Sequence, residues 1–164
     1  MQHIITPKEV GVLCRFCGVD DDDMEKVIAD VEQLDIKPQI GSELLASVLN
    51  DPEHHKDLLT GSTYEVCGTM FIQNGLKKAA AFYAYARAVK NSAGRLTRSG
   101  WRTDADDQYS KGDSAERRAV VKDYLADADQ YLGEVLKFLK DTDYPLYRGG
   151  RKVKQTRMKT YIIG

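Results

Sequence analysis

Apolar residues recur every three to four positions along most of the chain, which is the period of α-helices that pack on one side. The clearest stretch runs from 114 to 140 over about seven turns, and Asp113 with Glu116 forms a capping box at its start. A second stretch, 76–89, is rich in alanine, which has the highest helix propensity and lets a neighbouring helix approach closely. We therefore expect these two segments to form the centre of a helical core.

Further helices are indicated by capping boxes, in which a Ser, Thr or Asp is followed three residues later by Glu. These boxes are Thr6/Glu9, Asp22/Glu25 and Ser62/Glu65. The expected helices cover residues 7–17, 22–34, 39–49, 64–89 and 114–140. Gly18 and Lys37-Pro38 end the first two, and Asn74-Gly75 divides or bends the fourth. Residues 50–61 are expected to form a loop or one short turn. The predicted fold class is therefore all-α, a small bundle of about five to six helices.

A long segment at about 91–112 interrupts the helical pattern with glycine, serine and aspartate. A loop of this length inside a small domain is unusual and is often functional. It carries Arg95, Arg98, Trp101 and Arg102. We expect these residues to pack on another subunit; the alternative is a surface loop with Trp101 inserted into the core.

The C-terminal end is basic, although the chain as a whole has a net charge of −1. Six cations and no acid lie between Arg148 and Lys159: Arg148, Arg151, Lys152, Lys154, Arg157 and Lys159. The rest of the chain therefore carries −7, and this asymmetry indicates an arm that binds an anionic partner. The alternative, which charge alone leaves open, is a solvated and disordered tail. We divide the chain into a helical domain, 1–143, and an extended docking arm, 144–164. The arm closes with Tyr161, Ile162 and Ile163, an apolar end suited to docking on a partner as an added strand.

Nothing in the sequence points to catalysis, a metal or a cofactor. No phosphate-binding loop, dinucleotide fingerprint, nucleophile elbow or zinc-protease motif occurs, so we expect neither an enzyme nor a small-molecule substrate. Cys14 and Cys17 lack the preceding strand of a redox motif and the second cysteine pair of a zinc site, so we interpret them, like Cys67, as small apolar residues on helices. Aspartates at 104, 106 and 107 with Asp113 offer a metal site only in principle, because their spacing matches no known motif.

Composition adds limits on the class of protein. Apolar residues make up 42% of the chain and charged residues 30%, as in ordinary globular domains. No apolar run approaches the roughly 18 residues of a membrane span. The N-terminus lacks the basic and apolar regions of a signal peptide, so we expect synthesis in a cytoplasm and no membrane partner.

The layout resembles the head–tail connector (adaptor, head-completion or ring) proteins of tailed bacteriophages, especially those of gut Bacteroidetes phages, including crAss-like phages. The resemblance covers most of residues 4–140, and its motifs are degenerate. It is carried by the opening Ile5-Thr6-Pro7-Lys8-Glu9-Val10, the acidic turn 20–28, Lys37-Pro38-Gln39-Ile40-Gly41, the alanine-rich segment 75–89, the turn 95–100 and the long helix 114–140.

The resemblance implies a structural virion protein that forms a ring of about twelve copies beneath the portal protein, made in the host bacterium and located at the head–tail interface. Such a ring extends the DNA channel and carries the next tail or stopper protein. Residues 91–112 would pack between subunits, and the cations of the arm would meet the portal or the passing DNA together with Tyr161, Ile162 and Ile163. The alternative is a nucleic-acid-binding regulatory or packaging protein that uses the basic tail, for which steep salt dependence is expected.

Overall fold

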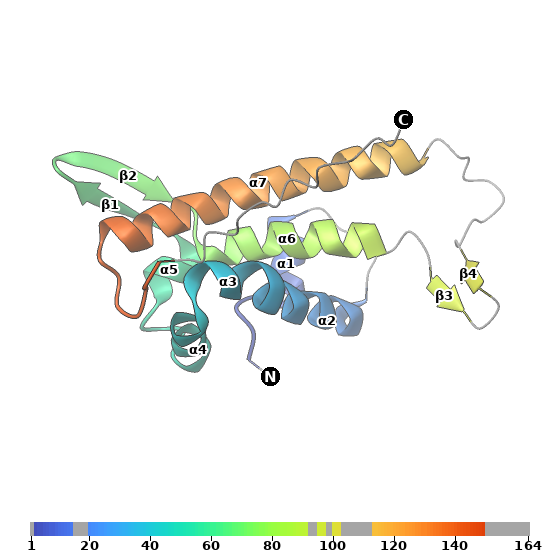
Figure 1. Ribbon diagram of the computed structural model, residues 1–164, viewed down its shortest axis with the longest axis horizontal. Helices are drawn as coiled ribbons and strands as arrows, with labels where there is room; N and C mark the ends of the chain where they lie inside the picture. Colours follow the sequence, from blue (N-terminus) through green and yellow to red (C-terminus); the bar gives the residue numbers. More distant parts are fainter. Residues whose placement is uncertain (1, 15–19, 92–94, 98–99, 103–112, 150–164) are drawn as a thin grey trace, which may run out of the picture.

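The computed structural model describes residues 2–14, 20–91, 95–97, 100–102 and 113–149. Its elements, in chain order, are helix α1 (Pro7–Leu13), α2 (Asp21–Val31), a π-helical turn η1 (Glu32–Ile36), α3 (Lys37–Ile40), α4 (Ser42–Asn50), α5 (Lys56–Thr60), strands β1 (Ser62–Val66) and β2 (Thr69–Gln73), α6 (Leu76–Asn91), strands β3 (Arg95–Thr97) and β4 (Gly100–Arg102), and α7 (Asp113–Asp141). The two longest helices, α6 and α7, run antiparallel along the length of the molecule (Figure 1).

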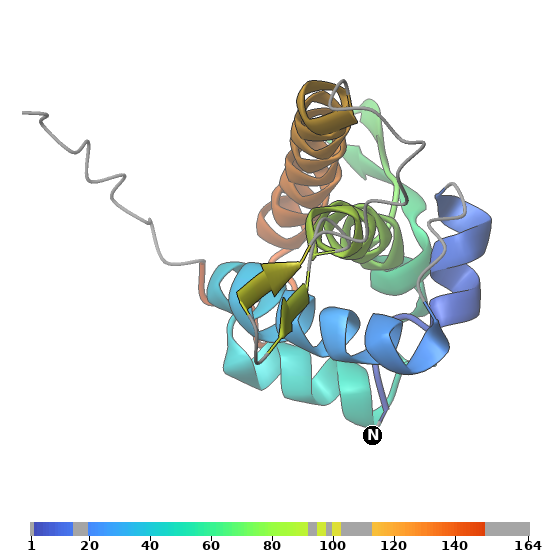
Figure 2. The same ribbon diagram turned by 90° about the vertical axis from the view of Figure 1, so that its right-hand side faces the viewer.

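Helix α6 is the centre of the core. It contacts α1, α2, α5, η1 and α7, and the end-on view shows it surrounded by other elements (Figure 2). Its alanines at 79, 80, 81, 84, 86 and 88 are buried, which confirms the prediction of a central helix that neighbours approach closely. Two polar contacts fix this packing: Tyr83 donates a hydrogen bond to Asp129 of α7, and Arg87 binds Asp35 of η1 through two nitrogens at 2.8 and 2.9 Å.

The expected helix over 64–89 is wrong in its first half, where the chain forms a β-hairpin. β1 and β2 pair antiparallel with Tyr64 opposite Phe71, and they are joined by Cys67 and Gly68, whose φ angles are 50° and 79°. Positive φ at both central residues is the geometry of a type I′ turn, which suits the twist of a two-residue hairpin. The fold is therefore mainly α-helical with small antiparallel sheets, and Cys67 lies at an exposed hairpin tip rather than in a helix.

Lys37-Pro38 does not end the second helical segment as predicted. The helical path continues from α2 through the π-helical turn η1 into α3, and Pro38 lies in the turn that directly follows η1. The expected helix over 39–49 is instead divided at Gly41, which has a φ of 90°. Within 50–61, where a loop or one short turn was expected, residues 56–60 form the short helix α5.

The start of α1 was predicted more accurately than the start of α2. The capping box of Thr6 and Glu9 is present as predicted, with both reciprocal hydrogen bonds. Helix α1 nevertheless ends at Leu13, so Cys14 is its C-cap residue, while Cys17 and Gly18 lie outside the described residues. Helix α2 is capped by Asp20, which accepts a hydrogen bond from the Asp23 amide at 2.9 Å, two residues earlier than the predicted cap.

The segment 91–112 is not irregular throughout. Helix α6 extends to Asn91, and β3 pairs antiparallel with β4, placing the Cα atoms of Leu96 and Trp101 opposite each other. Arg98 and residues 103–112 lie outside the described residues.

Candidate functional site

The base of the C-terminal arm is packed against the body. Beyond α7 the chain turns back, and Tyr144 and Tyr147 lie half-buried against the core. The Tyr144 hydroxyl hydrogen-bonds His55 Nδ1 at 2.9 Å, and His55 Nε2 hydrogen-bonds the Ser47 hydroxyl at 2.8 Å. Burial and the neighbouring His54 lower the pKa of His55, and burial raises the pKa of Tyr144. These uncharged groups join the arm to α4 and α5, a connection that the sequence pattern did not indicate.

Arg148 is the arm cation whose side chain the structure describes. It is exposed and lies 3.2 Å from the Glu43 carboxylate, which is exposed as well. An exposed ion pair of this kind contributes little to stability, so Arg148 remains available to a partner. The other predicted arm residues lie outside the described residues: Arg151, Lys152, Lys154, Arg157, Lys159, Tyr161, Ile162 and Ile163. Arg95, Trp101 and Arg102 are placed by backbone alone, on β3 and β4.

The β1–β2 hairpin is a second exposed surface, and the helix prediction for 64–89 missed it. Its inner face packs on α7 through Tyr64, which stacks on Phe71 and meets Phe138 edge-on. On its outer face, Met70 and Ile72 are 63% and 71% exposed. The alternation of Thr-Tyr-Glu-Val before Cys-Gly and Thr-Met-Phe-Ile after it was the signal that would have found this hairpin.

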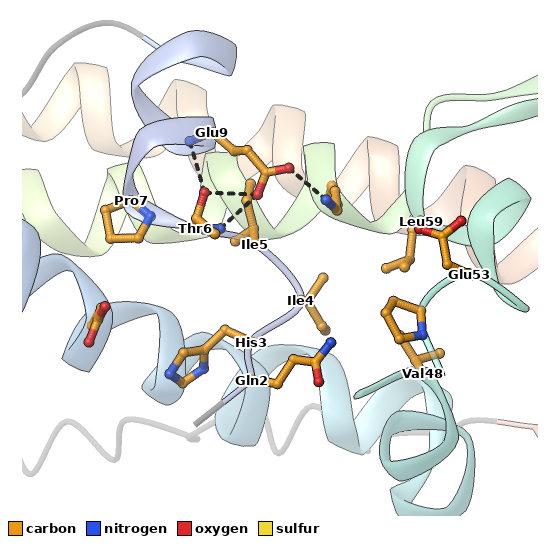
Figure 3. Close-up of a pocket in the computed structure, with 13 residues that line it drawn as sticks. Gln2, His3, Ile4, Ile5, Thr6, Pro7, Glu9, Val48, Glu53 and Leu59 are labelled. Atoms are coloured by element: carbon orange, nitrogen blue, oxygen red, sulfur yellow. Dashed lines mark hydrogen bonds and ion pairs between the residues drawn. The ribbon is translucent and has the colours of Figure 1, made fainter. Parts of the chain in front are cut away.

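A pocket of about 380 Å³ lies where the N-terminal segment crosses α4 and α5 (Figure 3). Its apolar wall includes Ile4, Val48 and Leu59. Glu9 binds Lys77 at 2.6 Å; partial burial opposes ionisation, but hydrogen bonds from Lys77 and Thr6 hold the pKa of Glu9 below its ordinary value. The hydroxyl and carboxylate of Thr6 and Glu9 lie 3.0 Å apart, but they cap α1, which is a structural role.

The N-terminal segment is held at this pocket by a buried acid. Glu32 accepts a hydrogen bond from the Ile4 amide at 2.6 Å and lies 3.0 Å from His3 Nδ1. Both contacts satisfy a carboxylate that would be costly to bury alone. The polar groups of this pocket therefore hold the chain in place, and the contacts seen here do not form a nucleophile–base arrangement among the described residues.

Two further features of the described residues concern metals and membranes. Across the described residues, no group of three or more His, Cys, Asp or Glu side chains is arranged to hold a metal ion. The aspartates at 104, 106 and 107 lie outside that range, and Asp113 begins α7. Within the same part of the chain, no helix is long and apolar enough to cross a bilayer.

Comparison with known proteins gives one family. No curated protein and no solved structure matches the sequence significantly. Residues 36–157 match a family of unknown function, DUF6712, and this range runs from the end of η1 through α7 into the arm. Since the match covers well over half of the chain, the protein belongs to the DUF6712 family.

Proposed function

We propose that the protein is a structural virion component, a head–tail connector that assembles as a ring of about twelve copies between the portal and the next tail or stopper protein of a tailed phage. The observation that carries this proposal is the fixed base of the basic arm. Tyr144 is hydrogen-bonded to the buried His55, so the cations that follow it start from a defined point on an acidic body. This is the arrangement expected of a subunit that presents a charged arm to a neighbour.

A closed ring needs two different contact surfaces on each subunit, because its interfaces are head-to-tail. The hairpin face with Met70 and Ile72 is one surface that supports this interpretation, because these two exposed apolar side chains lie on the same face of β2. The arm is a second surface, and residues 95–102, with their two paired strands, are a third. In this proposal the 91–112 segment packs between subunits and the basic part of the arm meets acidic groups of the portal or DNA in the channel.

The test is capture of the tagged chain from the lysate in which it naturally occurs, followed by native mass spectrometry of the complex. We expect a particle of megadalton order with many copies of this chain and a ring of portal subunits. The doubly charge-reversed arm, Arg151→Glu with Lys152→Glu, should lose the portal. The matched control, Lys8→Glu with Lys56→Glu, changes the net charge equally at two exposed body positions and should retain it.

Two other results would contradict the proposal. A complex that contains no portal, with or without the arm substitutions, would remove the connector role. A single chain that brings down DNA, with an affinity that falls steeply as salt rises, would instead favour the nucleic-acid-binding function.

A further inference from the structure

The outer edge of β1 is an open strand edge with a definable set of backbone groups. Because Cys67 and Gly68 form a two-residue turn, Val66 and Thr69 are a hydrogen-bonded pair, and such pairs alternate along the hairpin. Thr63 and Glu65 are then the residues of β1 whose N–H and C=O groups point away from β2. No third strand pairs with β1 in the part of the chain that the structure describes.

The position of the hairpin leaves this edge accessible. β2 lies next to α7, and the hairpin projects beside the C-terminal end of that helix (Figure 1). The inner face is anchored by Tyr64 on Phe138, and Lys137 lies 3.7 Å above the Phe71 ring. A two-stranded hairpin is only marginally stable without such packing, and a third strand would complete it.

The outer face of the hairpin defines the chemistry of an added strand. It carries the exposed apolar side chains of Met70 and Ile72 and one exposed acid, Glu65, which is paired across the strands with Met70. An extended segment with apolar and β-branched residues, preceded by cations, would cover the apolar side chains and pair its charge with Glu65.

We propose that the apolar end of the arm, residues 160–163, pairs as a third strand with the open edge of β1 in a second copy of this chain. The sequence Thr-Tyr-Ile-Ile consists of residues with high β-propensity, and Lys159 directly precedes it. The alternation of a strand places Tyr161 and Ile163 on one face, where a tyrosine ring can reach diagonally across β1 toward β2.

The length of the arm favours a second copy over the same chain. Tyr161 lies twelve positions beyond Gly149, a reach of about 40 Å when the chain is extended. The 29 residues of α7 span about 44 Å, so the arm is almost as long as the body's longest helix. The arm base and the hairpin both contact Phe138, so reaching its own β1 would require the whole arm to fold back as a loop. This inference rests on the proposed ring, for which it supplies one subunit contact.

The experiment uses the purified full-length chain without portal or DNA, with its mass followed by sedimentation over a concentration series. We expect reversible association of the native chain. Thr63→Pro removes an outward N–H, and Ile162→Asp puts a charge in the docking strand; each should weaken association by more than about tenfold. Thr63→Val keeps the N–H and Gln155→Asp adds the same charge outside the docking strand, so both controls should associate normally.

Mixing the two weakened variants tests exchange between copies. The arm of the Thr63→Pro chain can still dock on the intact edge of the Ile162→Asp chain, so the mixture should form a one-to-one complex and nothing larger. A native chain that stays monomeric, unchanged association of both variants, or a mixture without heterodimer would each overturn the proposal. If Ile162→Asp chains still form portal-bound rings, strand exchange fails while the connector function stands. If exchange occurs but no portal is captured, the connector function fails and strand exchange stands.

Discussion

Two glycines make a close backbone crossing where α5 ends and α6 begins. Gly75 has a φ of 89°, and a Cβ there would lie 2.5 Å from the Leu59 carbonyl oxygen and 2.6 Å from the Gly61 nitrogen. We expect Gly75→Ala to destabilise the protein by about 3 kcal/mol or more, because backbone atoms on both sides must move. The measurement is the free energy of unfolding in urea.

Gly68 provides the control for this substitution. It also has a positive φ, 79°, but a Cβ there meets no atom within 4 Å. Gly68→Ala should therefore cost only the left-handed conformation, about 1 kcal/mol. Equal losses for the two variants would mean that the crossing at Gly75 is not as close as described.

Because His55 is buried, we expect the free energy of unfolding to depend on pH. Its pKa is lowered in the folded protein by burial and by His54, so the unfolded chain binds a proton more readily. Stability from this residue is therefore fully present above the ordinary pKa of about 6.5 and decreases as pH falls through that value toward the folded-state pKa. His55→Gln should flatten the fall in the free energy of unfolding between about pH 7 and pH 5.

The adjacent histidine is the matched control. His54 is exposed and contributes to the shift only through its charge, so His54→Gln should leave most of the pH dependence in place. If His54→Gln flattens the curve as much as His55→Gln, burial is not the main cause of the shift.

At the scale of elements, helix prediction succeeded where long apolar stripes agreed with helix propensity. The apolar stripe predicted both ends of α7 to within one residue. The alanines of α6 predicted its position at the centre of the core. The helix prediction for residues 62–73 was wrong because Ser62 and Glu65 match a helix-capping pattern, which is a local signal. The hairpin forms instead because Tyr64 and Phe71 pack against α7. That tertiary contact is invisible to a short window of sequence.

The side of α7 that packs toward α6 leads to a prediction about substitutions on that side. Val135 is fully buried, and Leu132 is 5% exposed, on the stripe that packs toward α6. Val135→Asp or Leu132→Asp would bury an unpaired carboxylate, so either should abolish cooperative thermal unfolding. Gln130→Asp places the same group at an exposed position and should change the free energy of unfolding by less than about 0.5 kcal/mol. Soluble, stable Val135→Asp protein would contradict the facing described.

At the scale of the whole molecule, sequence reasoning separated a body from an arm on charge and helical pattern. It placed the division after residue 143, where the helical period ends. The structure adds that Tyr144 and Tyr147 pack against the core beyond that division, because a turn after α7 brings them back onto it. Composition alone could not reveal this, since the partners of Tyr144 lie about 90 residues earlier in the chain.

Two truncations distinguish the packed base of the arm from the rest. Deleting 150–164 removes no described contact, so we expect the far-ultraviolet circular dichroism and the melting temperature of the full chain. Deleting 144–164 also removes the Tyr144–His55 hydrogen bond and leaves part of the Phe138 ring uncovered. The helices should still form, because α6 and α7 are complete, but the free energy of unfolding should fall by about 2–4 kcal/mol. A collapse of helical signal in the longer deletion would mean that the arm base is essential to folding. Equal melting temperatures in both truncations would mean that Tyr144 and Tyr147 do not stabilise the body, and the arm would then start at residue 144 in structure as well as in charge.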